Sequence, residues 1–108
     1  MTTKKDNKKI KELTEAVLAL KTRNEARRFF RDLLTEKELI EFGNRWKAAK
    51  MLSKNIKYTE IEKETGLSST TVARVSKWLN SGKGGYKLML KRLNHQHNFL
   101  LREENGCG

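Results

Sequence analysis

The chain has 108 residues, with 24 Lys and Arg against 13 Asp and Glu, which gives a formal net charge of +11 at pH 7. A chain this short can build one modest core, so we expect no internal catalytic cavity and no enzyme activity. Its single cysteine, Cys107, excludes an intramolecular disulfide framework and a cysteine-based zinc finger. No apolar run resembles a membrane span or a signal peptide, so the sequence predicts a cytoplasmic protein with no membrane partner. We also expect no metal and no cofactor.

The positive charge is distributed unevenly along the chain. Residues 1–34 hold ten basic and five acidic side chains, and residues 35–65 hold seven and six. From Thr65 to Arg102 there is no acidic residue. A basic surface attracts nucleic acid, anionic membranes and acidic proteins alike, so charge alone does not choose a partner. The seven basic residues of the acid-free stretch are Arg74, Lys77, Lys83, Lys87, Lys91, Arg92 and Arg102.

Apolar residues recur at helical spacing along most of the chain, and no segment shows the alternation of a β-strand. The pattern predicts one helix from Ile10 to Leu20 and a second from Asn24 to Leu34. We expect a flexible basic arm at 1–8, which would add affinity for a polyanion or only solubility, one helical domain over 9–102 and a tail at 103–108. The fold class is therefore all-α, with about six helices.

The centre of the chain predicts a longer helix that begins after Thr35, because Thr35 and Glu38 have the spacing of a capping box. This helix ends near Ser53. A last amphipathic helix from Tyr86 to Leu100 follows the glycine-rich break at Gly82–Gly85.

Two short helices around a glycine predict a helix-turn-helix over about residues 59–80. Thr59 and Glu62 have the spacing of a second capping box, and Gly66 supplies the positive φ that ends the first helix. Small hydroxylated residues at the start of the second helix can approach DNA closely, and basic residues further along reach base edges or phosphates. We expect Ile61, Leu67, Val72 and Val75 to point inward. The residues that we expect to contact DNA are Thr59, Ser68, Ser69, Thr70, Thr71, Ala73, Arg74, Lys77 and Lys83.

Other interpretations compete with these motifs. An ordinary helical hairpin would show the same spacing, and Glu62 brings a carboxylate that would repel DNA if it faced the backbone. His95 and His97, with Cys107, do not predict a metal site, because histidines two residues apart point to different faces of a helix. Gly82–Gly85 lacks the spacing and preceding strand of a phosphate-binding loop, so we expect a helix cap and hinge there.

Several short motifs between residues 34 and 90 match a known family. They are Leu34-Thr35-Glu36-Lys37-Glu38-Leu39, Arg45-Trp46, Tyr58-Thr59-Glu60-Ile61, Glu64-Thr65-Gly66, Ser69-Thr70-Thr71-Val72-Ala73-Arg74-Val75 and Leu79-Asn80-Ser81-Gly82-Lys83-Gly84-Gly85-Tyr86. Together they resemble the Trp repressor superfamily and, within it, the small Trp-repressor-related proteins of the YerC/YecD type. The resemblance implies an intertwined helical homodimer that presents two helix-turn-helix units to double-stranded DNA. A partner chain would then cover Leu13, Val17, Phe29, Phe30 and Leu33.

The resemblance also implies an amino-acid effector site at Thr35, Arg45 and Arg74. A small glycine and a small serine that make room for the ligand in the Trp repressor correspond here to Val75 and Trp78, whose bulk fills or reshapes the space. We therefore expect this site to be vestigial, with Trp78 as a built-in plug. Tryptophan is then not the effector, and the two arginines pair with glutamate or reach phosphate.

The sequence thus predicts a sequence-specific DNA-binding transcriptional regulator, a repressor by resemblance, that does not respond to tryptophan. The alternative is a dimeric architectural or protein-interaction module that binds nucleic acid without sequence preference. RNA binding is a weaker alternative, because the sequence shows no aromatic stacking platform.

Overall fold

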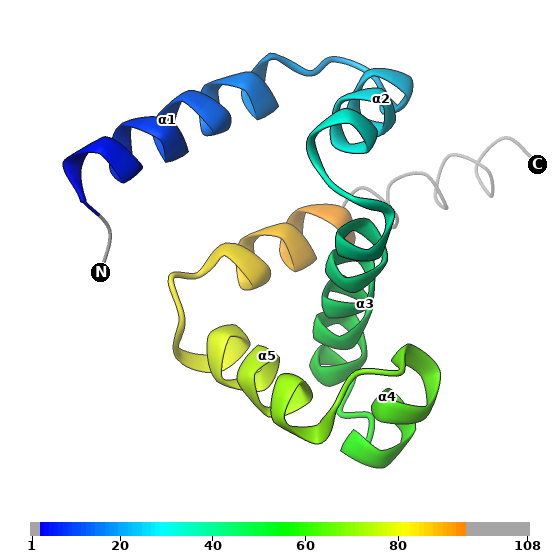
Figure 1. Cartoon of the computed structure of the whole chain (residues 1–108). Coiled ribbons are helices and arrows are strands. Elements are labelled where there is room, and N and C mark those ends of the chain that lie inside the picture. Colours follow the sequence, from blue (N-terminus) through cyan, green and yellow to red (C-terminus); the bar gives the residue numbers. More distant parts are fainter. Residues whose placement is uncertain (1–2, 95–108) are drawn as a thin grey trace, which may run out of the picture. The chain divides into compact units, whose positions relative to one another are not determined.

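The computed structural model describes residues 3–94, and the regular structure in this part of the chain is entirely helical (Figure 1). Helical backbone also covers residues 85–94, so the predicted all-α fold with about six helices is confirmed. No helix within residues 3–94 has the length and apolar character needed to cross a membrane. The five labelled helices are α1 (Lys4–Ala19), α2 (Arg23–Leu33), α3 (Glu36–Ser53), α4 (Tyr58–Thr65) and α5 (Ser69–Ser81).

Some predictions fall outside the described residues. They concern the end of the last helix, the tail at 103–108 and the weighed metal ligands His95, His97 and Cys107.

The chain divides into two compact units between Leu39 and Ile40, a boundary that lies inside α3. The first unit contains α1, α2 and the first turn of α3. The second unit contains the rest of α3, then α4, α5 and the helical backbone at 85–94. This boundary falls within the segment 9–102, for which the sequence predicts one domain.

Helix α1 begins at Lys4 rather than at Ile10, because Thr3 and Asp6 form a capping box that the sequence interpretation missed. The Thr3 hydroxyl accepts a hydrogen bond from the Asp6 N–H at 3.1 Å, and the Asp6 carboxylate accepts one from the Thr3 N–H at 3.3 Å. These bonds satisfy two of the N–H groups that a helix start leaves unpaired. The flexible arm expected at 1–8 is therefore helical from Lys4 onward.

The first unit has no core of its own. None of its described residues is buried, although α1 and α2 each carry an apolar stripe. Phe29 and Phe30 of α2 are half-buried, with ring centroids 5.9 Å apart, and Leu33 is 46% exposed. Helices of this length are marginally stable alone in water. The exposed apolar residues of α1 include Ile10, Leu13 and Val17.

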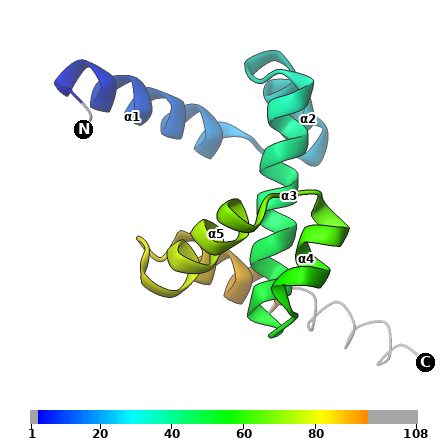
Figure 2. The same cartoon turned by 60° about the horizontal axis from the view of Figure 1, so that its bottom comes forward.

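The core of the second unit forms where the C-terminal part of α3 meets α4 and α5 (Figure 2). Residues 85–94 return to this core, because Tyr86 stacks on Trp46 of α3 with ring centroids 6.3 Å apart. The inward orientation predicted for the helix-turn-helix is confirmed, with Leu67 partly buried against the core. The fully buried core residues are Ala48, Ala49, Ile61, Val72 and Val75.

The capping box predicted at the start of α3 is confirmed. The Glu38 N–H donates to the Thr35 hydroxyl at 3.1 Å, and the Thr35 N–H donates to the Glu38 carboxylate at 3.0 Å. The bond from the Thr35 backbone, followed by the interaction with its side chain, lowers the pKa of Glu38 below its ordinary value.

Glu38→Gln is expected to remove an acid-sensitive contribution to stability. The lowered pKa means that the carboxylate stabilises the fold above its ordinary value of 4.5, and that this contribution is lost as the pH falls through the lowered pKa. Urea unfolding between about pH 7 and about pH 3 measures the effect. The difference in unfolding free energy between the wild type and the variant should shrink toward acid. A difference that stays constant, or one that Glu36→Gln in the same turn reproduces, would contradict the assignment.

Candidate nucleic-acid interface

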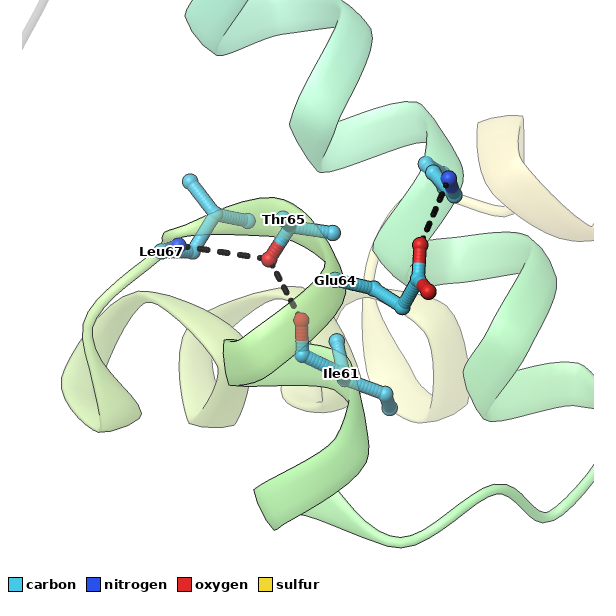
Figure 3. A network of polar contacts seen from close by, with 5 residues as sticks. Ile61, Glu64, Thr65 and Leu67 are labelled. Carbon is cyan, nitrogen blue, oxygen red and sulfur yellow. Dashed lines mark hydrogen bonds and ion pairs between the residues drawn. The ribbon is translucent and has the colours of Figure 1, made fainter.

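The turn between α4 and α5 is held by one glycine and one buried hydroxyl. Gly66 ends α4 with φ 72°, and its N–H donates to the Glu62 carbonyl oxygen at 2.8 Å. The buried Thr65 hydroxyl donates to the Ile61 carbonyl oxygen at 2.7 Å and accepts the Leu67 N–H at 3.2 Å (Figure 3). These bonds connect the last turn of α4 to the chain beyond Gly66, so they fix the direction in which α5 begins.

The capping box expected from Thr59 and Glu62 is wrong. Helix α4 begins at Tyr58, its N-cap is Lys57, and no side chain caps it. Thr59 is therefore the second residue of the helix, whereas a capping hydroxyl must stand just before the first helical residue. The exposed Thr59 hydroxyl makes no hydrogen bond within the described chain, so it remains available to a ligand.

The carboxylates of α4 are partly neutralised by α3. Lys47 of α3 lies 3.1 Å from the Glu64 carboxylate, and this ion pair joins the two helices (Figure 3). Glu62, the carboxylate that would repel DNA if it faced the DNA backbone, is half-buried.

At the start of α5, two side-chain hydroxyls are hydrogen-bonded within the described chain and two are not. Ser68 is the N-cap: its hydroxyl accepts the Thr71 N–H at 3.1 Å and donates to the Thr71 hydroxyl at 3.0 Å. Ser69 and Thr70 are exposed, and neither their hydroxyls nor their N–H groups have a partner in the part of the chain that the structure describes. Unpaired N–H groups at a helix start, reinforced by the helix dipole, form a ready site for phosphate.

Four exposed side chains lie in one row on α5, at Thr70, Ala73, Arg74 and Lys77. Their spacing of three, four and seven residues places them on one helix face, which we call the α5 stripe. The predicted outward direction of these residues is confirmed, because the other side of α5 is buried. Among residues 3–94, no carboxylate lies within ion-pair distance of Arg74 or Lys77. The buried residues of α5 are Val72, Val75 and Leu79.

An open apolar groove of about 660 Å³ lies beside the end of α5. Trp78 lines this groove and is 43% exposed in the single chain. Lys83, a predicted DNA contact, also lines this groove and is exposed. The sequence interpretation missed the groove, whose lining residues are Trp46, Trp78, Gly82, Lys83, Gly85, Tyr86 and Met89.

Gly82→Ala is expected to destabilise the protein by about 1–3 kcal/mol, the usual cost of forcing an extra carbon into a packed site. A Cβ at Gly82 would collide with the carbonyl oxygen of Trp78. Gly85→Ala is the matched control, because nothing lies within 4 Å of a Cβ there. Urea unfolding of the two variants measures the difference, and equal stability would contradict the close approach.

The three residues of the expected vestigial effector site have separate environments. The Thr35 hydroxyl caps α3. Arg45 lies 3.5 Å from the Glu41 carboxylate, and its guanidinium carbon lies 5.6 Å from the centroid of the Phe42 ring. The expected pairing of an arginine with glutamate is therefore confirmed for Arg45, whereas Arg74 belongs to the α5 stripe.

Comparison with known proteins agrees with this arrangement. The family model described as Trp repressor protein matches residues 8–94. The uncharacterized protein YerC of Bacillus subtilis (strain 168) is 38% identical over 86 residues, which cover 80% of this chain and 83% of YerC. A TrpR-like protein from Eubacterium eligens ATCC 27750 is similar in structure, with a TM-score of 0.77 and 37% identity over 81% of this chain and 90% of that one. A Staphylococcus aureus protein gives a TM-score of 0.74 and 38% identity, with coverages of 79% and 85%. The chain therefore belongs to the Trp repressor family.

Proposed function

We propose that this protein is a homodimeric transcriptional regulator, a repressor, that binds specific sites in double-stranded DNA. The observation that carries this proposal is the α5 stripe, which offers two cations without an ion pair among residues 3–94, a hydroxyl and methyl groups on the second helix of a helix-turn-helix. In this motif the second helix enters the major groove and its N-terminal residues contact base edges. Membership of the Trp repressor family supports the same function.

The surroundings of the stripe suit a phosphate backbone. No acidic residue occurs between Thr65 and the end of the described chain, so nothing on α5 repels DNA. The free N–H groups of Ser69 and Thr70 can donate to one phosphate, while the Thr59 hydroxyl and the exposed Lys83 can reach others. The Ser68 hydroxyl caps α5 and donates to the Thr71 hydroxyl, so these two residues contribute by fixing the start of the helix that meets the DNA.

The apolar surface that one chain leaves exposed supports the proposed dimer. The first unit has an apolar stripe on two of its helices and no buried side chain among residues 3–39, and the second unit has the open groove beside Trp78. A second copy of the chain that covers these surfaces would give the first unit the core it lacks. It would also present two α5 helices to grooves about 34 Å apart, one turn of DNA.

Binding to DNA duplexes over a salt series tests this function. The proposal predicts tighter binding to a preferred pseudo-palindromic site than to a scrambled duplex of the same length, at every salt concentration. Affinity for both duplexes should fall as salt rises, since bound phosphates release counterions. Equal affinity for all sequences would contradict a specific regulator and support the architectural module.

Tryptophan is expected not to bind. Val75 is fully buried in the core, and Trp78 lines the groove with a bulky indole, so neither leaves the space that a small residue would. Titration calorimetry of the purified protein with free L-tryptophan should show no saturable heat. Saturable binding at micromolar concentrations would contradict this prediction.

A further inference from the structure

We infer that the α5 stripe reads a guanine and a neighbouring thymine methyl group in each half-site. This inference rests on the proposed function and adds the chemical identity of the bases. The stripe contains the guanidinium of Arg74, the ammonium of Lys77, the methyl groups of Thr70 and Ala73, and one hydroxyl.

The major-groove edges of the four bases differ in which protein groups can recognise them. Guanine presents two acceptors that suit arginine or lysine, and thymine presents a methyl group that suits small apolar contacts. Adenine is commonly read by the amide of Asn or Gln, and cytosine by a carboxylate. The stripe has neither an amide nor a carboxylate, so its own chemistry selects guanine and thymine.

The nearest side-chain amide on α5 is not placed to change this selection. Asn80 lies near the C-terminal end of α5, whereas base contacts in this motif come from the N-terminal residues of the helix. Its amide donates to the Ser76 hydroxyl at 3.4 Å. The Ser68 hydroxyl caps α5 and donates to the Thr71 hydroxyl, so both hydroxyls are already hydrogen-bonded. The groups left for base edges are therefore those of the stripe, together with the Ser69 hydroxyl.

The geometry of the stripe puts the two contacts close together. Ala73 and Arg74 are consecutive, and Thr70 lies one turn before them on the same face. The short Ala73 side chain lets the helix approach the bases, so that its methyl can touch a thymine methyl while the longer Arg74 reaches a guanine beside it. Consecutive bases in a strand are about 3.4 Å apart, a step that neighbouring residues of one helix can span.

Single-atom changes in the DNA test the inference on the preferred site recovered from a random duplex pool. Each thymine is replaced in turn by deoxyuridine, which removes only the C5 methyl, and each guanine by 7-deazaguanine, which removes only the N7 acceptor. We expect one deoxyuridine position per half-site to weaken binding about fourfold, the value of one buried methyl-sized group. We expect one adjacent 7-deazaguanine position to weaken it about fivefold or more.

Variants of the protein assign each effect to its side chain. Thr70→Ser and Ala73→Gly each remove one methyl group, and at least one of them should bind the thymine and deoxyuridine duplexes equally. Arg74→Ala should lose the sensitivity to 7-deazaguanine, because the alanine side chain has no donor and cannot reach the N7 acceptor. Lys83→Ala is the control: it should weaken all duplexes alike and keep both sensitivities. Circular dichroism confirms that each variant is folded before binding is compared.

The outcomes separate this inference from the proposed function. A preferred site without sensitivity to deoxyuridine, or with sensitivities that the variants retain, overturns the base assignment and leaves a specific regulator intact. A pool that yields no preferred site overturns both.

Discussion

Leu33→Asp is expected to dissociate the proposed dimer of twice 12.6 kDa into monomers. Leu33 is 46% exposed in the single chain and lies on the apolar face of α2 with Phe29 and Phe30. Burying one leucine contributes about 1.5–3 kcal/mol, and a symmetric dimer buries it twice. The dimer dissociation constant should therefore rise roughly 10²- to 10⁴-fold.

Light scattering coupled to size-exclusion chromatography measures this change at several concentrations. Arg31→Asp is the matched control, because it puts the same charge in the last turn of α2 but on the opposite face of the helix. The control should remain a dimer. A Leu33→Asp protein that stays dimeric, or a wild type that is monomeric at micromolar concentrations, would contradict a core that two chains build together.

Arg74→Ala is expected to weaken binding to the preferred duplex by about 1–3 kcal/mol, the value of one bidentate contact to a base. The loss should be much smaller on a scrambled duplex, because a base contact forms only where the matching base is present. Arg74 is free to make that contact, since it is exposed on the α5 stripe and has no ion pair within residues 3–94. Fluorescence anisotropy at one fixed salt concentration gives both dissociation constants.

Arg92→Ala is the control for the loss of one positive charge. Arg92 is exposed in the helical backbone at 85–94, outside the helix-turn-helix. Its removal should affect the two duplexes equally. If Arg74→Ala also affects them equally, Arg74 contacts phosphate and does not read a base.

Helix starts show what a local pattern can and cannot predict. Threonine stands three residues before glutamate at both Thr35 and Thr59, but only Thr35 caps a helix. Near Thr59, the loop before α4 sets where the helix begins. Asn55 takes a φ of 60° and Ile56 packs against the core, so α4 begins at Tyr58. Tertiary packing of this kind is not encoded in the four-residue pattern.

The candidate site also has parts that the sequence could predict and parts that it could not. The direction of Thr70, Ala73, Arg74 and Lys77 could be predicted, because the helical period alone sets it. The groove beside Trp78 could not be predicted, since its lining comes from α3, from the end of α5 and from residues 85–94. Segments that are distant in sequence meet there only because the chain turns back at Gly82–Gly85.

Selection of double-stranded DNA from a random pool by the full-length protein tests the central claim most directly. We expect enrichment of one pseudo-palindrome whose half-sites are centred about one helical turn apart, because a dimer would present two α5 helices. Successive rounds that enrich no sequence, although the protein retains salt-dependent binding to the pool, would contradict it.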